Sequence, residues 1–227
     1  MHDVAPDRRV IEKIAGHFQG SRWLQGYVRG KLRTDPAYTA VLEELRRRPQ
    51  PLLDIGCGLG LLSFFLREHG VTGPILGVDC DEPKIARAAG IAAREYSGLT
   101  FSVGDARNVS ADFGAVVMLD VLHYLDDANQ RRLLDDVAAR VPPGGWAMIR
   151  NGIRDGGLRY RITYTEELFV RAIGWIKGEG VINFPTREAV AAAFRQGGFE
   201  EEIRPLWGRT PFNSHLFVFR RIDRSSE

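Results

Sequence analysis

Short apolar runs alternate with longer amphipathic segments along most of this chain. The apolar runs are nearly continuous, which is typical of strands buried on both faces of a parallel sheet. They lie at 52–55, 75–79, 100–103, 115–119 and 146–150. Other segments repeat apolar residues at helical spacing, and these lie at about 61–69, 82–96, 129–141 and 186–196. The alternation predicts βαβ units built around a parallel sheet.

Three regions depart from this alternation. Residues 1–48 carry no strand pattern and repeat apolar residues at helical spacing, so we expect a helical N-terminal segment there. A helix rich in aromatic and Arg residues is expected in an insertion at 156–180, after the fifth strand. The last two strands, around 202–206 and 216–220, have no helix between them, so they should pair antiparallel.

These elements predict one domain over 1–227, with a Rossmann-like core at 49–222. A length of 227 residues suits a single α/β domain, and 44% hydrophobic with 26% charged residues is ordinary for a globular protein. The N-terminal segment and the insertion, which we expect to act as a helical lid, would both cover the mouth of a pocket in that core.

Charge and cysteine content narrow the classes of function. A net charge of +2 argues against a nucleic-acid partner. Cys57 and Cys80 belong to no C-x-x-C pair, so they make neither a zinc site nor a disulfide framework. No apolar run approaches the ~18 residues of a membrane span, and the first residues lack a signal-peptide pattern. We therefore expect a cytoplasmic protein.

A glycine-rich loop follows the first predicted strand, at Asp54-Ile55-Gly56-Cys57-Gly58-Leu59-Gly60. Glycines let the backbone approach a ligand closely. Asp79 ends the second strand beside this loop and can accept hydrogen bonds from two ribose hydroxyls. Asp105 follows the third strand at the same edge, where open α/β sheets bind ligands, and a helix-cap or loop role is the alternative for it. The G-x-G-x-G spacing disfavours a nicotinamide dehydrogenase, which uses G-x-G-x-x-G.

From about 51 to 220 the sequence resembles the class I S-adenosylmethionine-dependent methyltransferases. The loop at 54–60 resembles their first motif, Gly77-Val78-Asp79 their second and Val103-Gly104-Asp105-Ala106 their third, while Pro142-Pro143-Gly144-Gly145 resembles a turn that they also share. The resemblance implies a doubly wound, seven-stranded sheet whose last strand is antiparallel. It also implies S-adenosylmethionine as cofactor, S-adenosylhomocysteine as product, and no metal.

The same resemblance assigns parts of the cofactor to individual residues. It implies that the three loop glycines line the methionine moiety, Asp54 acts near the amino group, and Asp79 binds the ribose. It assigns the adenine to Asp105 and Ala106. The whole implied cofactor set is Asp54, Gly56, Cys57, Gly58, Gly60, Asp79, Cys80, Asp105, Ala106 and Asp120.

The residues after the fourth strand bear on the methyl acceptor. Motifs of base-modifying enzymes are absent there, and the stretch Leu-Asp-Val-Leu-His-Tyr-Leu at 119–125 resembles small-molecule members. His123 can accept a proton or simply pack beside the loop, and His215 and Tyr160 are further catalytic candidates. Asp120 lacks a partner acid for Mg²⁺. Residues expected to contact the acceptor, with core packing as the alternative for Tyr27, are Tyr27, Lys31, Arg154, Arg161, Tyr164 and Asn213.

A narrower resemblance concerns the insertion together with Tyr-Val-Arg-Gly-Lys-Leu at 27–32 and Arg-Thr-Pro-Phe-Asn at 209–213. These features are similar to bacterial methyltransferases of aryl polyene pigment pathways. They imply an aromatic acceptor, methylated on a phenol oxygen or a ring carbon and either free or held on a carrier protein. A nucleic-acid methyltransferase and a non-catalytic S-adenosylmethionine-binding protein are the alternatives, and the oligomeric state is open.

Overall fold

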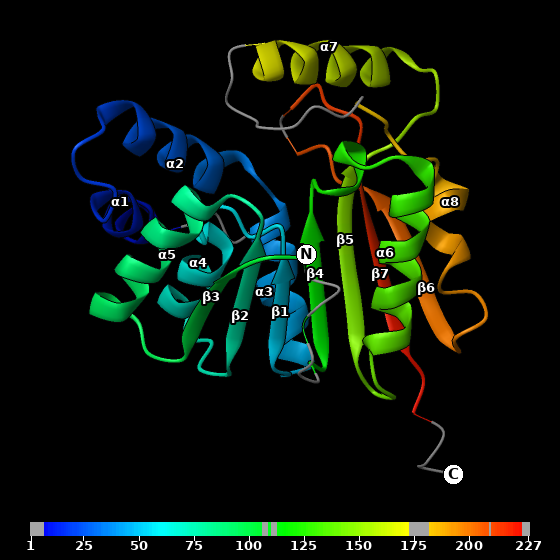
Figure 1. Cartoon of the computed structure of the whole chain (residues 1–227), viewed down its shortest axis with the longest axis horizontal. Helices are drawn as coiled ribbons and strands as arrows, with labels where there is room; N and C mark the ends of the chain where they lie inside the picture. Colours follow the sequence, from blue (N-terminus) through cyan, green and yellow to red (C-terminus); the bar gives the residue numbers. More distant parts are fainter. Residues whose placement is uncertain (1–6, 106–108, 110–112, 173–181, 209, 224–227) are drawn as a thin grey trace.

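The computed structural model describes residues 7–105, 109, 113–172, 182–208 and 210–223. Within them, seven strands form one sheet in the order β3-β2-β1-β4-β5-β7-β6, as Figure 1 shows. The strands are β1 Leu52–Ile55, β2 Ile75–Asp79, β3 Leu99–Val103, β4 Ala115–Leu119, β5 Trp146–Gly152, β6 Phe199–Pro205 and β7 Ser214–Arg221.

The first five strands run parallel, and β7 runs antiparallel to both β5 and β6. This confirms the predicted seven-stranded sheet with an antiparallel last strand. The sixth strand begins at Phe199, earlier than the expected 202, because Phe199 pairs with Arg221 and the ladder continues from there. The parallel register of β1 with β2 and β4 puts their carboxyl ends at one edge.

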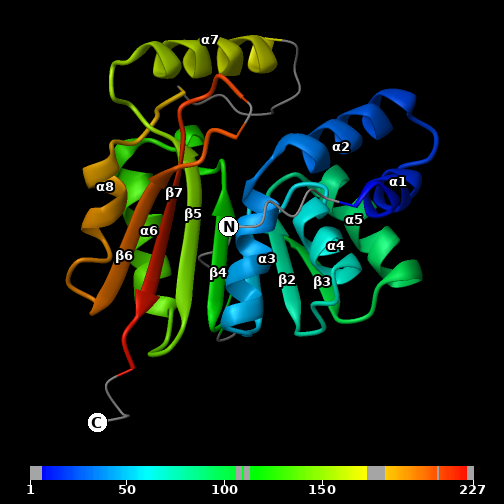
Figure 2. The same ribbon diagram turned by 180° about the vertical axis from the view of Figure 1, so that it is seen from behind.

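Helices cover both faces of the sheet, because successive strand residues point to opposite sides. One buried cluster joins one face to the first five helices, and a second joins the other face to two later ones. The first group is α1 Arg8–Gly16, α2 Arg22–Thr34, α3 Ala37–Arg47, α4 Leu61–Glu68 and α5 Glu82–Glu95, and the second is α6 Asp127–Arg140 and α8 Arg187–Ala192. Figure 2 shows α3 against the sheet.

Side-chain caps set where the later helices begin. The Asp126 carboxylate accepts a hydrogen bond from Asn129 N (2.7 Å), so α6 starts at Asp127, before the expected 129. Thr186 Oγ1 accepts from Ala189 N (3.2 Å) and caps α8, as the sequence predicts. That helix ends at Ala192, short of the expected 196.

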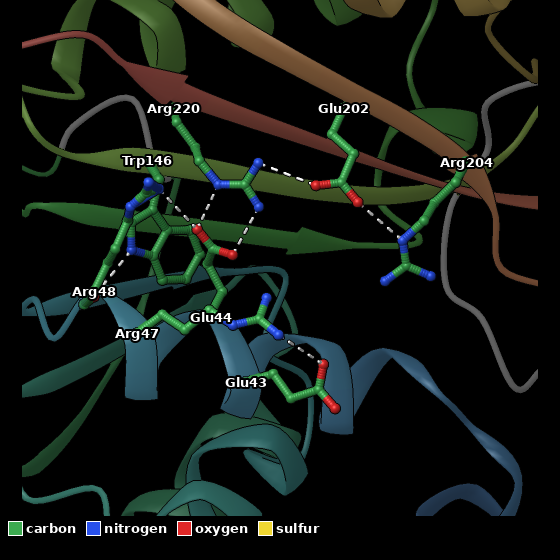
Figure 3. Close-up of polar contacts among 8 residues, drawn as sticks. All are labelled: Glu43, Glu44, Arg47, Arg48, Trp146, Glu202, Arg204 and Arg220. Carbon is green, nitrogen blue, oxygen red and sulfur yellow. Dashed lines mark hydrogen bonds and ion pairs between the residues drawn. The ribbon is translucent and has the colours of Figure 1, made fainter. Parts of the chain in front are cut away.

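The N-terminal segment is joined to the antiparallel end of the sheet by a buried ion pair, shown in Figure 3. Glu44 on α3 is 3% exposed and accepts from Arg220 on β7 at both oxygens, at 2.7 and 2.8 Å. Arg220 also donates to Glu202 on β6 at 3.0 Å. Nearby, the Trp146 indole donates to the backbone of Arg48 at 3.2 Å. The bidentate pair of Glu44 and Arg220 fixes α3 on the sheet.

One helix, α7 (Leu158–Ala172), lies across the carboxyl ends of β4 and β5 in Figures 1 and 2. It occupies the first part of the expected insertion, and 173–181 lie outside the described residues. Arg159 donates to the carbonyl of Thr210 at 2.9 Å, and Thr163 Oγ1 accepts from Asn213 N at 2.8 Å. The loop before β7 therefore holds α7 in place. Within the described residues, no helix has the length and apolar character to cross a membrane.

Candidate functional site

The glycine loop between β1 and α4 is tightly bound to the end of β2. Gly56 N donates to Val78 O at 2.8 Å, and Gly56 itself has a φ of +72°. A Cβ at Gly56 would lie 2.3 Å from Val121 Cγ2, and one at Gly60 would lie 2.6 Å from Phe101 Cζ. Only glycine fits these positions. The loop thus presents bare backbone at the carboxyl edge of the sheet.

Asp79 lies beside this loop, as the sequence predicts. Its Oδ2 accepts from Gly58 N at 2.8 Å and its Oδ1 accepts from Asp81 N at 2.9 Å. Each carboxylate oxygen keeps a further lone pair, so two ribose hydroxyls can still be bound. Gly104 N donates to the carbonyl of Asp79 at 3.0 Å, which brings the end of β3 to the same place.

Other residues of the expected cofactor set lie at the same carboxyl edge of the sheet, and one lies outside the described residues. Cys80 and Asp105 are exposed next to Asp79 and Gly104, and Ala106 lies outside the described residues. Cys57 lies within the loop, and burial raises the pKa of its thiol, which makes it a poor nucleophile.

Asp54 is the most unusual residue of the site. It is 2% exposed, and its Oδ2 has no hydrogen-bond partner within the part of the chain that the structure describes. Burial, followed by the charge of Asp79, raises its pKa to about 7. A buried carboxylate oxygen without a donor is costly. An ammonium group, such as that of the expected cofactor, fits this position.

A second polar cluster joins the end of α2 to the ends of β4 and β5. Arg150 Nη2 lies 2.8 Å from Asp35 Oδ2 and 2.6 Å from Asp120 Oδ2, while Lys31 Nζ lies 2.9 Å from Asp35 and 3.7 Å from Asp120. Burial alone would raise the pKa of Asp35, but Arg150 and Lys31 hold it below its usual range. Asp120 has a φ of +59°, in the left-handed region. The structure thus brings the predicted Lys31 and Asp120 together.

Aromatic side chains gather beneath α7, around Phe184. The Phe184 ring centroid lies 4.9 Å from that of His123, 5.9 Å from that of Tyr160 and 6.4 Å from that of Tyr164. Tyr124 packs on His123 at 4.0 Å. Three predicted residues, His123, Tyr160 and Tyr164, therefore share one cluster. Phe184 was missed because it lies in an irregular stretch between helices, with no periodic pattern to mark it.

His123 is 3% exposed and is held at both ring nitrogens. Its Nδ1 lies 3.1 Å from Asn151 Oδ1, and its Nε2 lies 3.3 Å from Glu167 Oε1 on α7. The Tyr124 hydroxyl donates to the same Glu167 oxygen. Sequence reasoning missed Glu167, because a Glu on an amphipathic helix gives no signal of its own. The helical pattern predicts that Glu167 lies on the lid helix, but it does not predict which side chain Glu167 faces.

Two predicted residues lie near the base of α7. His215 on β7 places its Nδ1 3.2 Å from the carbonyl of Asn213, and burial lowers its pKa. Asn213 is buried, and its side chain donates to Ile153 O at 2.9 Å. Their contacts hold the loop beneath α7, and a role toward the acceptor stays a prediction.

Three other predicted residues lie apart from the aromatic cluster. Arg161 is exposed on α7, and Arg154 lines a separate hollow of about 260 Å³ between α6 and α8. Tyr27 stacks on Trp23, with ring centroids 6.0 Å apart, and Trp23 is 58% exposed. Tyr27 itself is partly buried and packs against the core cluster, which agrees with the core-packing alternative. Contact of these residues with the acceptor stays a prediction.

No group of three or more His, Cys, Asp or Glu side chains in the described ranges is arranged to hold a metal ion. The expected metal-free chemistry stays a prediction.

Comparisons with known proteins agree with the fold. A family model described as a methyltransferase domain matches residues 24–202, which is most of the chain. The ubiquinone biosynthesis O-methyltransferase of Coxiella burnetii is 28% identical over 106 residues, covering 45% of this chain and 44% of that protein. The ribosomal protein L11 methyltransferase of Burkholderia vietnamiensis is 30% identical over 105 residues, covering 46% and 32%. The chain thus matches less than half the length of these relatives.

Solved structures share the fold at low identity. The magnesium protoporphyrin IX methyltransferase of Synechocystis PCC 6803 with bound SAH has a TM-score of 0.66 at 17% identity, covering 93% of both chains. Human N-acetylserotonin methyltransferase in complex with SAM has a TM-score of 0.56 at 18% identity, covering 82% of this chain and 51% of that one. Likeness at this identity concerns the architecture alone.

Proposed function

Because the chain belongs to the class I S-adenosylmethionine-dependent methyltransferases, we propose that it transfers a methyl group from S-adenosylmethionine to a small aromatic acceptor. The acceptor atom is a phenol oxygen or an activated ring carbon. The acceptor is free or held on a carrier protein. The observation that carries this proposal is the cluster of aromatic rings between α7 and the sheet edge that bears the glycine loop.

The residues at the loop suit the cofactor. The loop backbone at Gly56, Gly58 and Gly60 would line the methionine moiety, and Asp79 keeps lone pairs for the ribose. The unpartnered oxygen of Asp54 would accept from the ammonium group. When bound, S-adenosylmethionine supplies a methyl group on a sulfonium, and S-adenosylhomocysteine remains. The assignment of the adenine to Asp105 and Ala106 belongs to the same proposal.

The lid suits an aromatic acceptor. Tyr160, Tyr164 and Phe184 offer ring faces and edges that pack against a planar molecule, and aromatic pairs add to the gain from burial. A helix over the carboxyl edge also keeps water from the reacting groups. Since methyl transfer is an in-line displacement, the protein mainly provides proximity, orientation and a place for the acceptor's proton.

Turnover tests this function directly. Purified protein is incubated with S-adenosylmethionine and a panel of phenols and electron-rich aromatic compounds, and mass spectrometry measures the methylated product. We expect turnover of at least one aromatic compound. An Asp79→Ala variant should lose about 100-fold or more in cofactor affinity by calorimetry, because two hydrogen bonds to a charged group are removed.

The other outcomes point elsewhere. Methylation of RNA or DNA without any aromatic product would indicate a nucleic-acid methyltransferase. Tight cofactor binding with no product from any acceptor would indicate a non-catalytic binding protein.

A further inference from the structure

A carboxylate on α7 meets a histidine on the sheet edge. Glu167 Oε1 lies 3.3 Å from His123 Nε2 and accepts a hydrogen bond from the Tyr124 hydroxyl. His123 and Tyr124 belong to the 3-10 turn η2 (Leu122–Tyr124), which directly follows Val121. Val121 is the residue that a Cβ at Gly56 would touch. The histidine and carboxylate thus lie close to the glycine loop.

Asn151 determines which ring nitrogen of His123 carries the proton. Its Nδ2 donates to the carbonyl of Gly152 at 2.7 Å, so its Oδ1 must face His123. An amide oxygen can only accept, and His123 Nδ1 therefore carries the hydrogen. His123 Nε2 is then left with a lone pair. Among the described residues it has no hydrogen-bond donor, although it is fully buried.

The pair is therefore short of one proton. Burial alone would raise the pKa of Glu167, but the hydrogen bond and charge that His123 supplies when Nε2 holds a proton, together with the Tyr124 hydrogen bond and the Lys31 charge, lower the pKa. Glu167 is thus ionised near neutral pH, and its Oε1 is a second acceptor facing Nε2. Two acceptors 3.3 Å apart with no hydrogen between them, one on the buried His123 and one on the half-buried Glu167, are unfavourable. A proton placed between them would satisfy both.

We propose that Glu167 is the catalytic residue that takes the acceptor's proton, and that His123 stores it. This inference rests on the proposed function. In the step, the acceptor's O–H bond breaks and the oxygen forms its bond to the methyl carbon, while the electron pair of the carbon–sulfur bond stays on sulfur. The proton goes to the ionised Glu167 carboxylate, and the same proton then passes from Glu167 Oε1 to His123 Nε2, which leaves the carboxylate ionised again. Bulk water later removes it.

Surrounding charges fit this direction of proton flow. The charged groups near the pair are Glu166 on α7, Asp120 at the end of β4 and Lys31 on α2. Lys31 favours the ionised form of Glu167, so a proton does not rest on that carboxylate. The imidazolium formed on His123 would then face an ionised Glu167. Asn151 acts as a positioning residue, because it keeps Nε2 free to receive the proton.

The two halves of the pair come from different parts of the fold. His123 is on the sheet edge and Glu167 is on α7, which crosses above it in Figure 1. The proton acceptor is thus complete only when α7 lies in the position seen here.

Glu167→Gln tests the proposal, with Glu166→Gln as the matched control on the same helix. The amide keeps the size of Glu167 and can still accept from Tyr124. We expect kcat to fall about 100-fold or more with little change in KM. The acidic limb of the pH profile, where the pair takes up a proton, should move or disappear. The kcat of Glu166→Gln should stay within about threefold of the wild-type value, which is the scale of a small electrostatic effect. Circular dichroism melting and cofactor affinity would check the fold.

His123→Gln and the double variant complete the test. If the two side chains act as one unit, the double variant should be about as slow as either single variant. Overturning results are a Glu167→Gln enzyme with nearly normal kcat and an unchanged acidic limb, or two variants whose losses multiply.

A second readout does not depend on turnover. The nitrogen-15 signals of the histidine rings, assigned with His123→Gln, report the pH at which Nε2 gains a proton. That pH should fall by about one unit in Glu167→Gln, because an opposite charge is removed. An unchanged pH would overturn the coupling of the pair. If the wild-type protein methylates no aromatic compound while the signal does shift, the proposed function fails and the coupled pair remains.

Discussion

Glu44 and Asp54 are buried to nearly the same degree, at 3% and 2% exposure, yet they differ in their hydrogen-bond partners. Glu44, on α3, accepts from Arg220 at both oxygens. Asp54, before the glycine loop, leaves Oδ2 without a partner within the described ranges. A buried carboxylate that the fold satisfies is structural, whereas one that the fold leaves unsatisfied marks the place where a ligand completes the structure.

The pKa values follow the same division. Burial alone would raise the pKa of Glu44, but its hydrogen bonds and ion pair with Arg220 lower it. Burial raises the pKa of Asp54, and the charge of Asp79 raises it further. Glu44 therefore stays charged for the fold, while Asp54 becomes fully charged only with a cation beside it.

Removing the partner of Glu44 should have the largest effect on stability. In Arg220→Met, Glu44 loses its bidentate partner and keeps Arg48 at the longer distance of 3.5 Å. We expect the free energy of unfolding, measured with urea, to fall by about 3–5 kcal/mol. Glu202→Gln, at the exposed end of the same group, should cost less than about 1 kcal/mol. Equal losses in the two variants would contradict the structural role assigned to the Glu44 pair.

The pH dependence of cofactor binding should show the next largest effect. With a pKa of about 7, Asp54 is mostly neutral at pH 6 and mostly ionised at pH 8. Affinity for S-adenosylmethionine should therefore rise about tenfold between these values, as measured by calorimetry. Asp54→Asn should bind weakly with a flat pH profile. A wild-type profile as flat as that of the variant would argue against the assignment of Asp54 to the ammonium group.

Stability should depend on pH in opposite directions at the two carboxylates. Asp54 has a folded pKa above its unfolded value of 3.8, so its contribution is full below that value and is lost as the pH rises through about 7. Glu44 has a folded pKa below its unfolded value of 4.5, so its contribution is present above that value and is lost in acid. Asp54→Asn should therefore raise the melting temperature of the cofactor-free protein at pH 8.

Asp120 gives the smallest effect, because it is paired with Arg150 but strained in its backbone. Its φ of +59° costs a residue with a Cβ about 1 kcal/mol more than glycine. The free energy of unfolding, measured with urea, should thus be about 1 kcal/mol higher in Asp120→Gly than in Asp120→Ala. Both variants should be equally impaired in methyl transfer. Equal stability of the two variants would mean that the backbone at Asp120 is not strained.

Most of the sheet and the cofactor loop could be predicted from the sequence, because their signals are local. Strands such as 52–55 and 115–119 are continuous apolar runs, and the loop glycines have a backbone requirement that no other residue meets. Element ends were less accurate, since strand pairing and caps determine them. Asp126, for example, starts α6 two residues early by accepting from Asn129.

The pairings across the site could not be predicted, because they join distant positions. Arg150 meets Asp35 across 115 positions, and Arg220 meets Glu44 across 176. Tyr124 meets Glu167 across 43. Helical periodicity shows which face of a helix is apolar, but it does not show which polar side chain on that helix will lie opposite another element.

The sequence by itself determined the class of fold and the position of the cofactor loop, since apolar runs and glycine spacing act over a few residues. The tertiary structure decided which charged groups are satisfied. It gave Glu44 an arginine, left Asp54 Oδ2 without a partner among the described residues, and brought Glu167 close to His123. Burial removes water as an alternative partner, so the fate of each polar group depends on the few side chains that packing places within about 3 Å of it.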